Sequence, residues 1–280
     1  MGGTGRSGTH ALAFLLNEHP NYWMIPGETR LQAEARGLPG LIDGQESLDK
    51  VCKALRGRYF NRTTPEKKSR GLHRAGVTRA QVDAAVDALR TDFEGGDPLV
   101  STATFMRALF DPLAEAAGAQ HWVEQTPPNV EYAAFHQRMF ADAGTLHIVR
   151  DGRDVAASVA RLPWGPKTML AGLEWWAEHL RAAEAAVGDP ARVHVVGFES
   201  LILTDRDAEY ARLLEFLQVP DHAGMRTYFN ESLTSEKAHV GRWKTQLDES
   251  ERTAFEEMYQ QLLDGLLRDG ISCARAVVKE

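Results

Sequence analysis

The chain has few cysteines and no long apolar run. Its 280 residues include only Cys52 and Cys273, which excludes a disulfide framework and a cysteine-rich zinc module. No apolar run approaches the ~20 residues that a membrane-spanning helix needs, and the first residues do not read as a signal peptide. These absences predict a soluble cytoplasmic enzyme with no membrane partner.

Positive charge is also in short supply. The sequence has 32 Lys and Arg against 39 Asp and Glu, a net charge of −7, which disfavours nucleic acid as a partner. An anionic ligand must therefore be held by a local group of positive charges rather than by the overall field. The 43% hydrophobic and 25% charged content is ordinary for a globular protein, and the length suits one α/β domain, residues 1–280.

Short apolar strands alternate with longer helical patterns after Pro98. The expected strands are His121–Glu124, Leu146–Val149 and Val193–Val196. The expected helices are Ala103–Ala117, Glu131–Phe140, Val155–Arg161, Lys167–Val187, Tyr210–Leu217 and Ser250–Leu267. This alternation predicts a three-layer α/β/α fold with a parallel sheet.

Residues 31–97 have a different character, polar and mostly helical in pattern. Thr78 is expected to cap a helix over Arg79–Phe93, and Asn61–Ser69 is expected to form an exposed loop because it is charged and lacks an apolar period. We predict that residues 31–97 are a helical insertion in the α/β domain.

The glycine-rich run GTGRSGTH, Gly3 to His10, precedes an expected helix over Thr9–Glu18. Its glycines permit a tight turn whose N–H groups converge on a tetrahedral anion, and the helix adds its positive end at the same point. Arg6 and nearby hydroxyl groups add side-chain donors. The run therefore predicts a phosphate-binding loop.

The lysine and magnesium-binding hydroxyl of a Walker A loop are missing. That motif continues after its last glycine with Lys and then Ser or Thr, whereas Thr9 and His10 stand in those places. Use of a nucleoside triphosphate with magnesium is therefore disfavoured.

A second group of polar residues follows the strand Leu146–Val149. Arg150 comes directly after it, and Ser158 lies two helical turns further on, in a helix that Asp154 is expected to cap. Ligands in such sheets bind at the carboxyl ends of strands, so Arg150 and Ser158 can clamp a second phosphate group. Alone, the charged run after Val149 reads equally well as a turn with local ion pairs.

Together the two runs resemble the sulfotransferases that use 3′-phosphoadenosine 5′-phosphosulfate as donor, with motifs closest to the bacterial and tyrosylprotein-like branches. GRSGT, Gly5 to Thr9, looks like the family's 5′-phosphosulfate loop, and Val149–Ser158 looks like its 3′-phosphate segment. Weaker echoes are Phe198–Leu201 and Val240–Lys244, the latter similar to a loop that closes over the cofactor. The motifs span nearly the whole chain.

The resemblance implies a role for each matching residue. Arg6 stabilises charge on the leaving phosphate and on the transferring group, without a metal. The 3′-phosphate is bound by Arg150 and Ser158. The 5′ end of the donor is held by Gly5, Arg6, Ser7, Gly8, Thr9 and His10. The closing loop contributes Arg242, Trp243 and Lys244.

Glu28 is the expected general base. It lies in GETR, Gly27 to Arg30, and a similar segment provides the catalytic carboxylate in the tyrosylprotein branch. Glu28 can equally serve structure by pairing with Arg30. One departure concerns Gln125, which stands where many relatives have lysine before Thr-Pro; Lys244 and Arg30 are the candidate substitutes.

The phosphate loop of this fold follows a buried central strand, yet only Met1 and Gly2 precede Gly3. Losing such a strand removes hydrogen bonds worth ~1 kcal/mol each and side chains worth ~1.5–3 kcal/mol each. We therefore expect the natural chain to begin upstream of Met1.

The expected activity is transfer of a sulfuryl group from the phosphosulfate donor to a hydroxyl or amine, releasing adenosine 3′,5′-bisphosphate. A small-molecule or carbohydrate acceptor is favoured and a protein tyrosine stays open, as does the oligomeric state. The insertion at residues 31–97 is expected to shape the acceptor pocket. The alternatives are a P-loop kinase of a small metabolite and a nucleotide-binding module without turnover.

Overall fold

The structure is a computed structural model, and it describes residues 1–63 and 69–278. At its centre lies a three-stranded parallel sheet in the order β1-β6-β7. Its strands are β1 (Gly2–Gly3), β6 (Thr145–Val149) and β7 (Val193–Gly197). Two smaller sheets are the parallel pair β2 (Tyr22–Met24) with β5 (His121–Val123), and the antiparallel pair β3 (Arg62–Thr63) with β4 (Ser69–Arg70).

The register of the central sheet brings two chain segments to one edge. Gly3 lies opposite Ile148, and Val149 lies opposite Gly197. Because the strands are parallel, the loop after β1 and Arg150 after β6 leave the sheet at the same end. This is the edge at which ligands of parallel sheets bind.

Helices make up most of the remaining chain. The α-helices are α1 (Thr9–Asn17), α2 (Leu38–Ile42), α3 (Leu48–Arg56), α4 (Arg79–Gly95), α5 (Pro98–Ala116), α6 (Ala133–Met139), α7 (Gly152–Val159), α8 (Met169–Ala185), α9 (Arg206–Leu217), α10 (Ala223–Ser232), α11 (Ser235–Ala238) and α12 (Glu249–Arg268). Shorter helical turns are η1 (Pro127–Tyr132), η2 (Pro190–Arg192), η3 (Ser200–Thr204), η4 (Arg242–Thr245) and η5 (Ser272–Val277).

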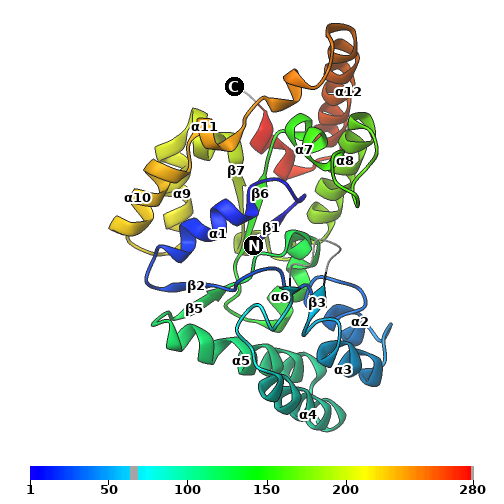
Figure 1. Ribbon diagram of the computed structural model, residues 1–280, viewed down its shortest axis with the longest axis vertical. Coiled ribbons are helices and arrows are strands. Elements are labelled where there is room, and N and C mark those ends of the chain that lie inside the picture. Colours follow the sequence, from blue (N-terminus) through cyan, green and yellow to red (C-terminus); the bar gives the residue numbers. More distant parts are fainter. Residues whose placement is uncertain (64–68, 279–280) are drawn as a thin grey trace.

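The helices cover both faces of the central sheet (Figure 1). Helices α1, α9 and α10 lie on one side and α7, α8 and α12 on the other, each group with its own buried core. Every residue of β6 is buried, as expected for a parallel strand covered on both faces. The prediction of an α/β fold with a parallel sheet is confirmed.

A third core is built mainly from residues 31–110, where α2, α3, α4 and α5 pack together, and is completed by Ile25 and by side chains from and next to α6. Thr78 caps α4 as predicted: its hydroxyl accepts from the Gln81 N–H, and the Gln81 side chain accepts from the Thr78 N–H. Of the loop expected over Asn61–Ser69, residues 64–68 lie outside the described residues.

The prediction that Asp154 caps the helix after β6 is wrong. Helix α7 begins at Gly152, and its N-cap is Asp151, whose carboxylate accepts from the Arg153 N–H at 2.9 Å. Asp154 lies within the first turn and is 4% exposed. Its carboxylate contacts residues far away in the sequence.

Close packing of α7 on α8 fixes the start of α7. The indole of Trp176 is fully buried, lies against Gly152 and donates from Nε1 to the Arg150 carbonyl at 3.2 Å. A Cβ atom at position 152 would come within 2.6 Å of this ring. The glycine therefore lets Trp176 hold the backbone that carries Arg150.

Substitution Gly152→Ala should lower the free energy of unfolding by about 1–3 kcal/mol, because a methyl group forces the buried indole to move. Urea denaturation measures the change. The control is Gly95→Ala near the end of α4, where a Cβ meets nothing within 4 Å, and it should be neutral or slightly stabilising. Equal stabilities of Gly152→Ala and wild type would contradict the assigned packing.

Candidate functional site

The loop between β1 and α1 has the backbone of an anion cradle. Gly5, Arg6 and Gly8 all have positive φ angles, +70°, +62° and +100°. A Cβ atom at Gly8 would lie 2.6 Å from Phe198, so the loop passes too close to that ring for any side chain. No side chain caps the N-terminus of α1 within the described chain, which leaves its first N–H groups and its positive end for an anion.

Arg6 joins the loop to α7. Its Nε donates to the hydroxyl of Ser158 at 2.9 Å, and its carbonyl accepts from Arg150 Nη1 at 3.3 Å. Arg6 is one of the few non-glycine residues with positive φ among those described, a strained conformation that concentrates at functional sites. The structure thus brings together three residues that the sequence predicted to bind the donor.

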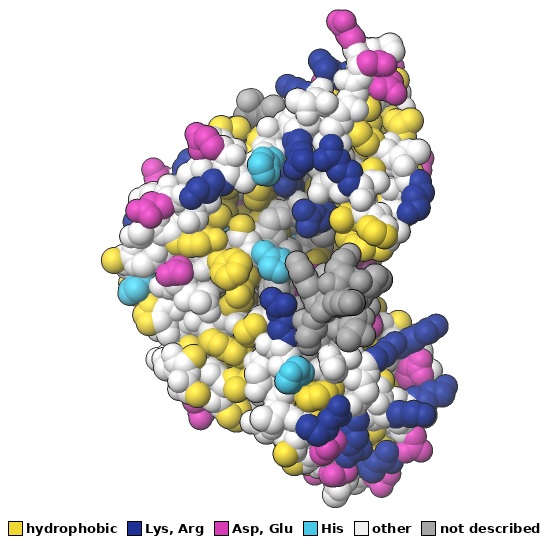
Figure 2. Space-filling model, viewed as in Figure 1, with side chains coloured by type: hydrophobic (Ala, Val, Ile, Leu, Met, Phe, Trp, Pro, Cys, Tyr) yellow, Lys and Arg dark blue, Asp and Glu magenta, His cyan; other side chains and the backbone are white. Residues whose placement is uncertain are grey.

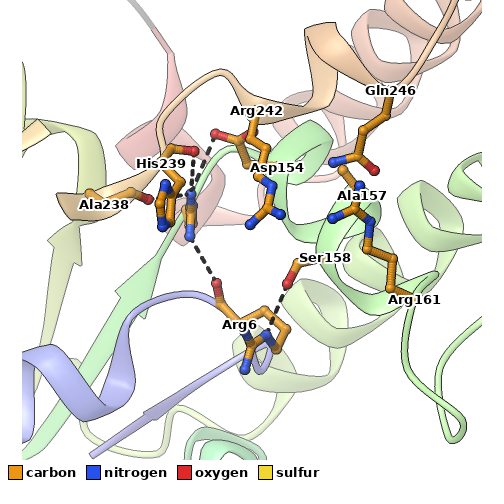
Figure 3. Close-up of a pocket in the computed structure, with 10 residues that line it drawn as sticks. Arg6, Asp154, Ala157, Ser158, Arg161, Ala238, His239, Arg242 and Gln246 are labelled. Carbon is orange, nitrogen blue, oxygen red and sulfur yellow. Dashed lines mark hydrogen bonds and ion pairs between the residues drawn. The ribbon is translucent and has the colours of Figure 1, made fainter. Parts of the chain in front are cut away.

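A cavity of about 90 Å³ opens between these residues (Figure 3). Three segments line it: the loop at Arg6; the strand end and α7 at Arg150, Asp154, Ala157, Ser158 and Arg161; and the 238–246 segment at Ala238, His239, Arg242 and Gln246. Four of these side chains are guanidinium groups. Figure 2 shows Lys and Arg side chains gathered over α7. This is the kind of local positive charge that an anionic ligand needs on a protein with a net charge of −7.

Arg150 connects the 238–246 segment to the sheet. Its Nη2 donates to the carbonyls of Ala238 and His239 at 3.0 and 3.3 Å, and it lies 3.5 Å from the carboxylate of Asp154. The Arg150 side chain is 12% exposed, so these contacts are largely shielded from water.

Sequence reasoning missed Arg161, which follows Ser158 by three residues and lies just beyond the end of α7. Arg161 and Arg242 both point toward the cavity beside Ser158 (Figure 3), and neither side chain makes a hydrogen bond or ion pair with the described residues. The spacing of three residues from Ser158 was a usable signal, because residues i and i+3 share a helix face.

Glu28 lies apart from this cavity, in the segment that follows β2. Its carboxylate pairs with Arg30 at 2.8 Å, and Arg30 also lies 3.6 Å from Glu34. Arg30 has a positive φ of +64°, a second strained residue in a motif that the sequence singled out. Both readings of Glu28 stay open, since the ion pair is present and the carboxylate is 14% exposed.

A buried carboxylate ties the Glu28 segment to the segment after β5. Glu124 accepts hydrogen bonds from the N–H and hydroxyl of Thr29 and from the N–H and hydroxyl of Thr126. The Arg30 N–H donates to the Thr126 hydroxyl. Residues 28–30 therefore lie against residues 124–126, which include Gln125, the residue at the position where many relatives have lysine.

Gln125 is fully buried, and neither its amide nitrogen nor its amide oxygen has a hydrogen-bond partner among the described residues. Such a group costs on the order of 1–3 kcal/mol, so a native structure keeps it only for a reason. Of the two candidate substitutes for lysine, Arg30 is the one adjacent to this position. Lys244 is exposed and lies over the Trp243 ring.

The remaining predicted site residues differ in exposure. His10 is exposed at the start of α1, whereas Ser7 and Thr9 are buried in the loop. Trp243 is 1% exposed, with its ring against Phe255 in the core that α12 and α7 share, and it does not line the cavity. No group of three His, Cys, Asp or Glu side chains within residues 1–63 and 69–278 is arranged to hold a metal.

We compared the sequence with models of known protein families. Residues 1–223 match the family model described as "Sulfotransferase family". The chain belongs to the sulfotransferase family. A search of curated proteins found no match.

A solved sulfotransferase structure shares the fold. The chain is similar to the sulfotransferase domain of the olefin synthase from Synechococcus PCC 7002, with a TM-score of 0.52, 15% identity, and 91% of this chain and 90% of that chain covered. It is also similar to sulfotransferase STF9 from Mycobacterium avium, with a TM-score of 0.43, 15% identity, and 93% and 74% covered. Within the described part of this sulfotransferase, no helix has the length and apolar character to cross a membrane.

A titratable group lies directly behind Arg150 in this sulfotransferase. Burial, aided by the nearby Asp151 carboxylate, raises the pKa of Glu199 to about 7. Its carboxylate accepts from the Asp151 N–H at 3.2 Å and lies 4.0 Å from Arg150 Nε. Glu199 therefore changes charge near neutral pH beside the cation at the strand end.

The pKa of Glu199 is higher in the folded than in the unfolded chain, so its contribution to stability is complete below about pH 4.5 and is lost as the pH rises through 7. Glu199→Gln should remove this loss, on the order of 3 kcal/mol between those two pH values. Urea denaturation of both proteins at several pH values gives the difference. A wild-type curve parallel to that of the variant would refute the assigned pKa.

Proposed function

We propose that this protein transfers a sulfuryl group from 3′-phosphoadenosine 5′-phosphosulfate to a hydroxyl or amine of an acceptor and releases adenosine 3′,5′-bisphosphate. The hydrogen bond between Arg6 and Ser158 carries the proposal. This bond joins the glycine-rich loop to the arginine-lined cavity at one edge of the sheet. A donor with anionic groups at both ends needs two neighbouring anion sites, and these two elements would supply them.

The two sites divide the donor between them. The loop from Gly5 to His10, with the N-terminus of α1, receives the 5′-phosphosulfate. The cavity beside Ser158 receives the 3′-phosphate, with charge from Arg150 and from Arg161 and Arg242, whose guanidinium groups have no other partner among the described residues. The closing loop from Arg242 to Lys244 completes this side.

The transfer is an in-line displacement at sulfur. The acceptor oxygen or nitrogen forms a bond to sulfur while the bond from sulfur to the 5′-phosphate oxygen breaks, and the electron pair stays on that phosphate. Arg6 stabilises the charge that develops there. The acceptor proton passes to the Glu28 carboxylate, and Arg30, which pairs with Glu28, supplies the positive charge that lysine gives in relatives.

The acceptor we propose is a small molecule or carbohydrate, bound between the Glu28 segment and the helices of residues 31–97. The side chains of Ile25 and Leu31, which flank this segment, pack into the same core as α3, α4 and α5. One domain, residues 1–280, would then provide the donor site from its sheet and the acceptor site from its helical insertion.

Isothermal titration calorimetry with adenosine 3′,5′-bisphosphate and AMP tests the donor site. The wild type should bind the bisphosphate more tightly without magnesium, and Arg150→Ala or Arg161→Ala should weaken it about tenfold or more while changing AMP binding less, because charge-assisted hydrogen bonds to the 3′-phosphate are lost. Arg181→Ala, which removes an arginine paired with Asp269 on the surface, is the control. Preference for magnesium-ATP would favour a kinase instead.

Glu28→Gln should reduce sulfuryl transfer ~10²–10⁴-fold, because the acceptor proton loses its base, while binding of adenosine 3′,5′-bisphosphate stays unchanged. The assay is bisphosphate release from the phosphosulfate donor with an acceptor chosen by screening hydroxyl and amine compounds. Glu34→Gln, which removes the other carboxylate near Arg30, is the matched control and should retain activity. Equal rates in both variants would assign Glu28 to structure.

A further inference from the structure

Asp154 is a buried carboxylate inside a pocket of arginines. Its side chain is 2% exposed, yet it lines the cavity together with Arg6, Arg161 and Arg242. A negative charge at this place opposes the binding of an anion, so its presence calls for another role. Asp154 does not cap α7, because Asp151 fills that position.

The carboxylate of Asp154 binds the backbone of the 238–246 segment. One oxygen accepts from the Gly241 N–H at 2.7 Å, and the other accepts from the Trp243 N–H at 3.2 Å. The same carboxylate lies 3.5 Å from Arg150, which offsets its charge. Hydrogen bonds to an ionised acceptor are among the stronger ones in proteins, and these two are shielded from water.

The backbone of this segment has an unusual shape that needs such support. His239 and Gly241 both have left-handed φ angles, +53° and +74°. A non-glycine residue keeps this conformation only where its surroundings enforce it. Arg150 donates hydrogen bonds to the carbonyls of Ala238 and His239. Asp154 accepts hydrogen bonds from the N–H groups of Gly241 and Trp243.

Arg242 sits between the two N–H groups that Asp154 binds. Its neighbour Trp243 is anchored in the core against Phe255, with the Arg153 guanidinium 4.9 Å from its ring. With Gly241 and Trp243 both fixed, the Arg242 side chain is directed into the cavity (Figure 3).

We infer that Asp154 is a positioning residue for the anion site: it holds the 238–246 segment through the N–H groups of Gly241 and Trp243, and thereby places Arg242 at the cavity. The inference rests on the proposed function only in naming the anion as the 3′-phosphate of the donor. Asp154 itself need not touch the ligand.

Amide hydrogen exchange measured by NMR on the protein without nucleotide tests the hold directly. In the wild type, the Gly241 and Trp243 amides should exchange more slowly than the Arg242 amide between them. In Asp154→Asn, an isosteric change, exchange at Gly241 and Trp243 should accelerate about tenfold or more, while β6 amides keep their protection. Asp151→Asn is the matched control on the same helix, since asparagine also caps helices, and it should leave the pattern unchanged.

Calorimetry with adenosine 3′,5′-bisphosphate supplies the second measurement. Asp154→Asn should bind it about tenfold more weakly than Asp151→Asn, with a smaller change for AMP. Wild-type exchange at Gly241 and Trp243 as fast as at Arg242, or full protection in a folded Asp154→Asn, would overturn the inference. A wild type that binds no bisphosphate would refute the proposed function instead, and the exchange pattern without nucleotide would still decide the role of Asp154.

Discussion

The geometry of the site depends on the guanidinium group of Arg150, which hydrogen-bonds backbone carbonyls from both ends of the chain. One partner is Arg6 in the first loop, and the others are Ala238 and His239 near the end. The backbone of Arg150 is held in turn by the buried indole of Trp176. A single strand end thus sets the relative positions of two cavity-lining segments that lie more than 200 residues apart in the sequence.

The fold and the tight glycine-rich turn before α1 were predictable because each is encoded by a contiguous pattern. The GRSGT run needs only its own backbone and the helix that follows, and the alternation of strands and helices fixes a parallel sheet. Arg150 precedes α7 and Ser158 lies two turns along it, so their proximity also follows from local spacing. Their contact with Arg6 then follows from the register of β1 on β6.

The role of Asp154 could not be predicted in this way. A lone Asp near a helix start indicates a cap, and its partners Gly241 and Trp243 are 87 and 89 residues further along the chain. The same reason hides the burial of Trp243, whose ring faces the core rather than the cavity. Likewise, the sequence does not reveal that the buried amide of Gln125 has no hydrogen-bond partner among the described residues; it shows only that glutamine stands where relatives have lysine.

The contacts of Asp154 fix the backbone of the 238–246 segment without involving the segment's side chains. Because the carboxylate contacts this segment only through the backbone N–H groups of Gly241 and Trp243, its hold does not depend on the side chains at positions 242 and 244. Gly241 is constrained by its left-handed φ, which favours glycine. Single substitutions at positions 242 and 244 can therefore alter the charge beside the cavity while the backbone beneath it persists, so the charge of this segment and its shape can evolve independently.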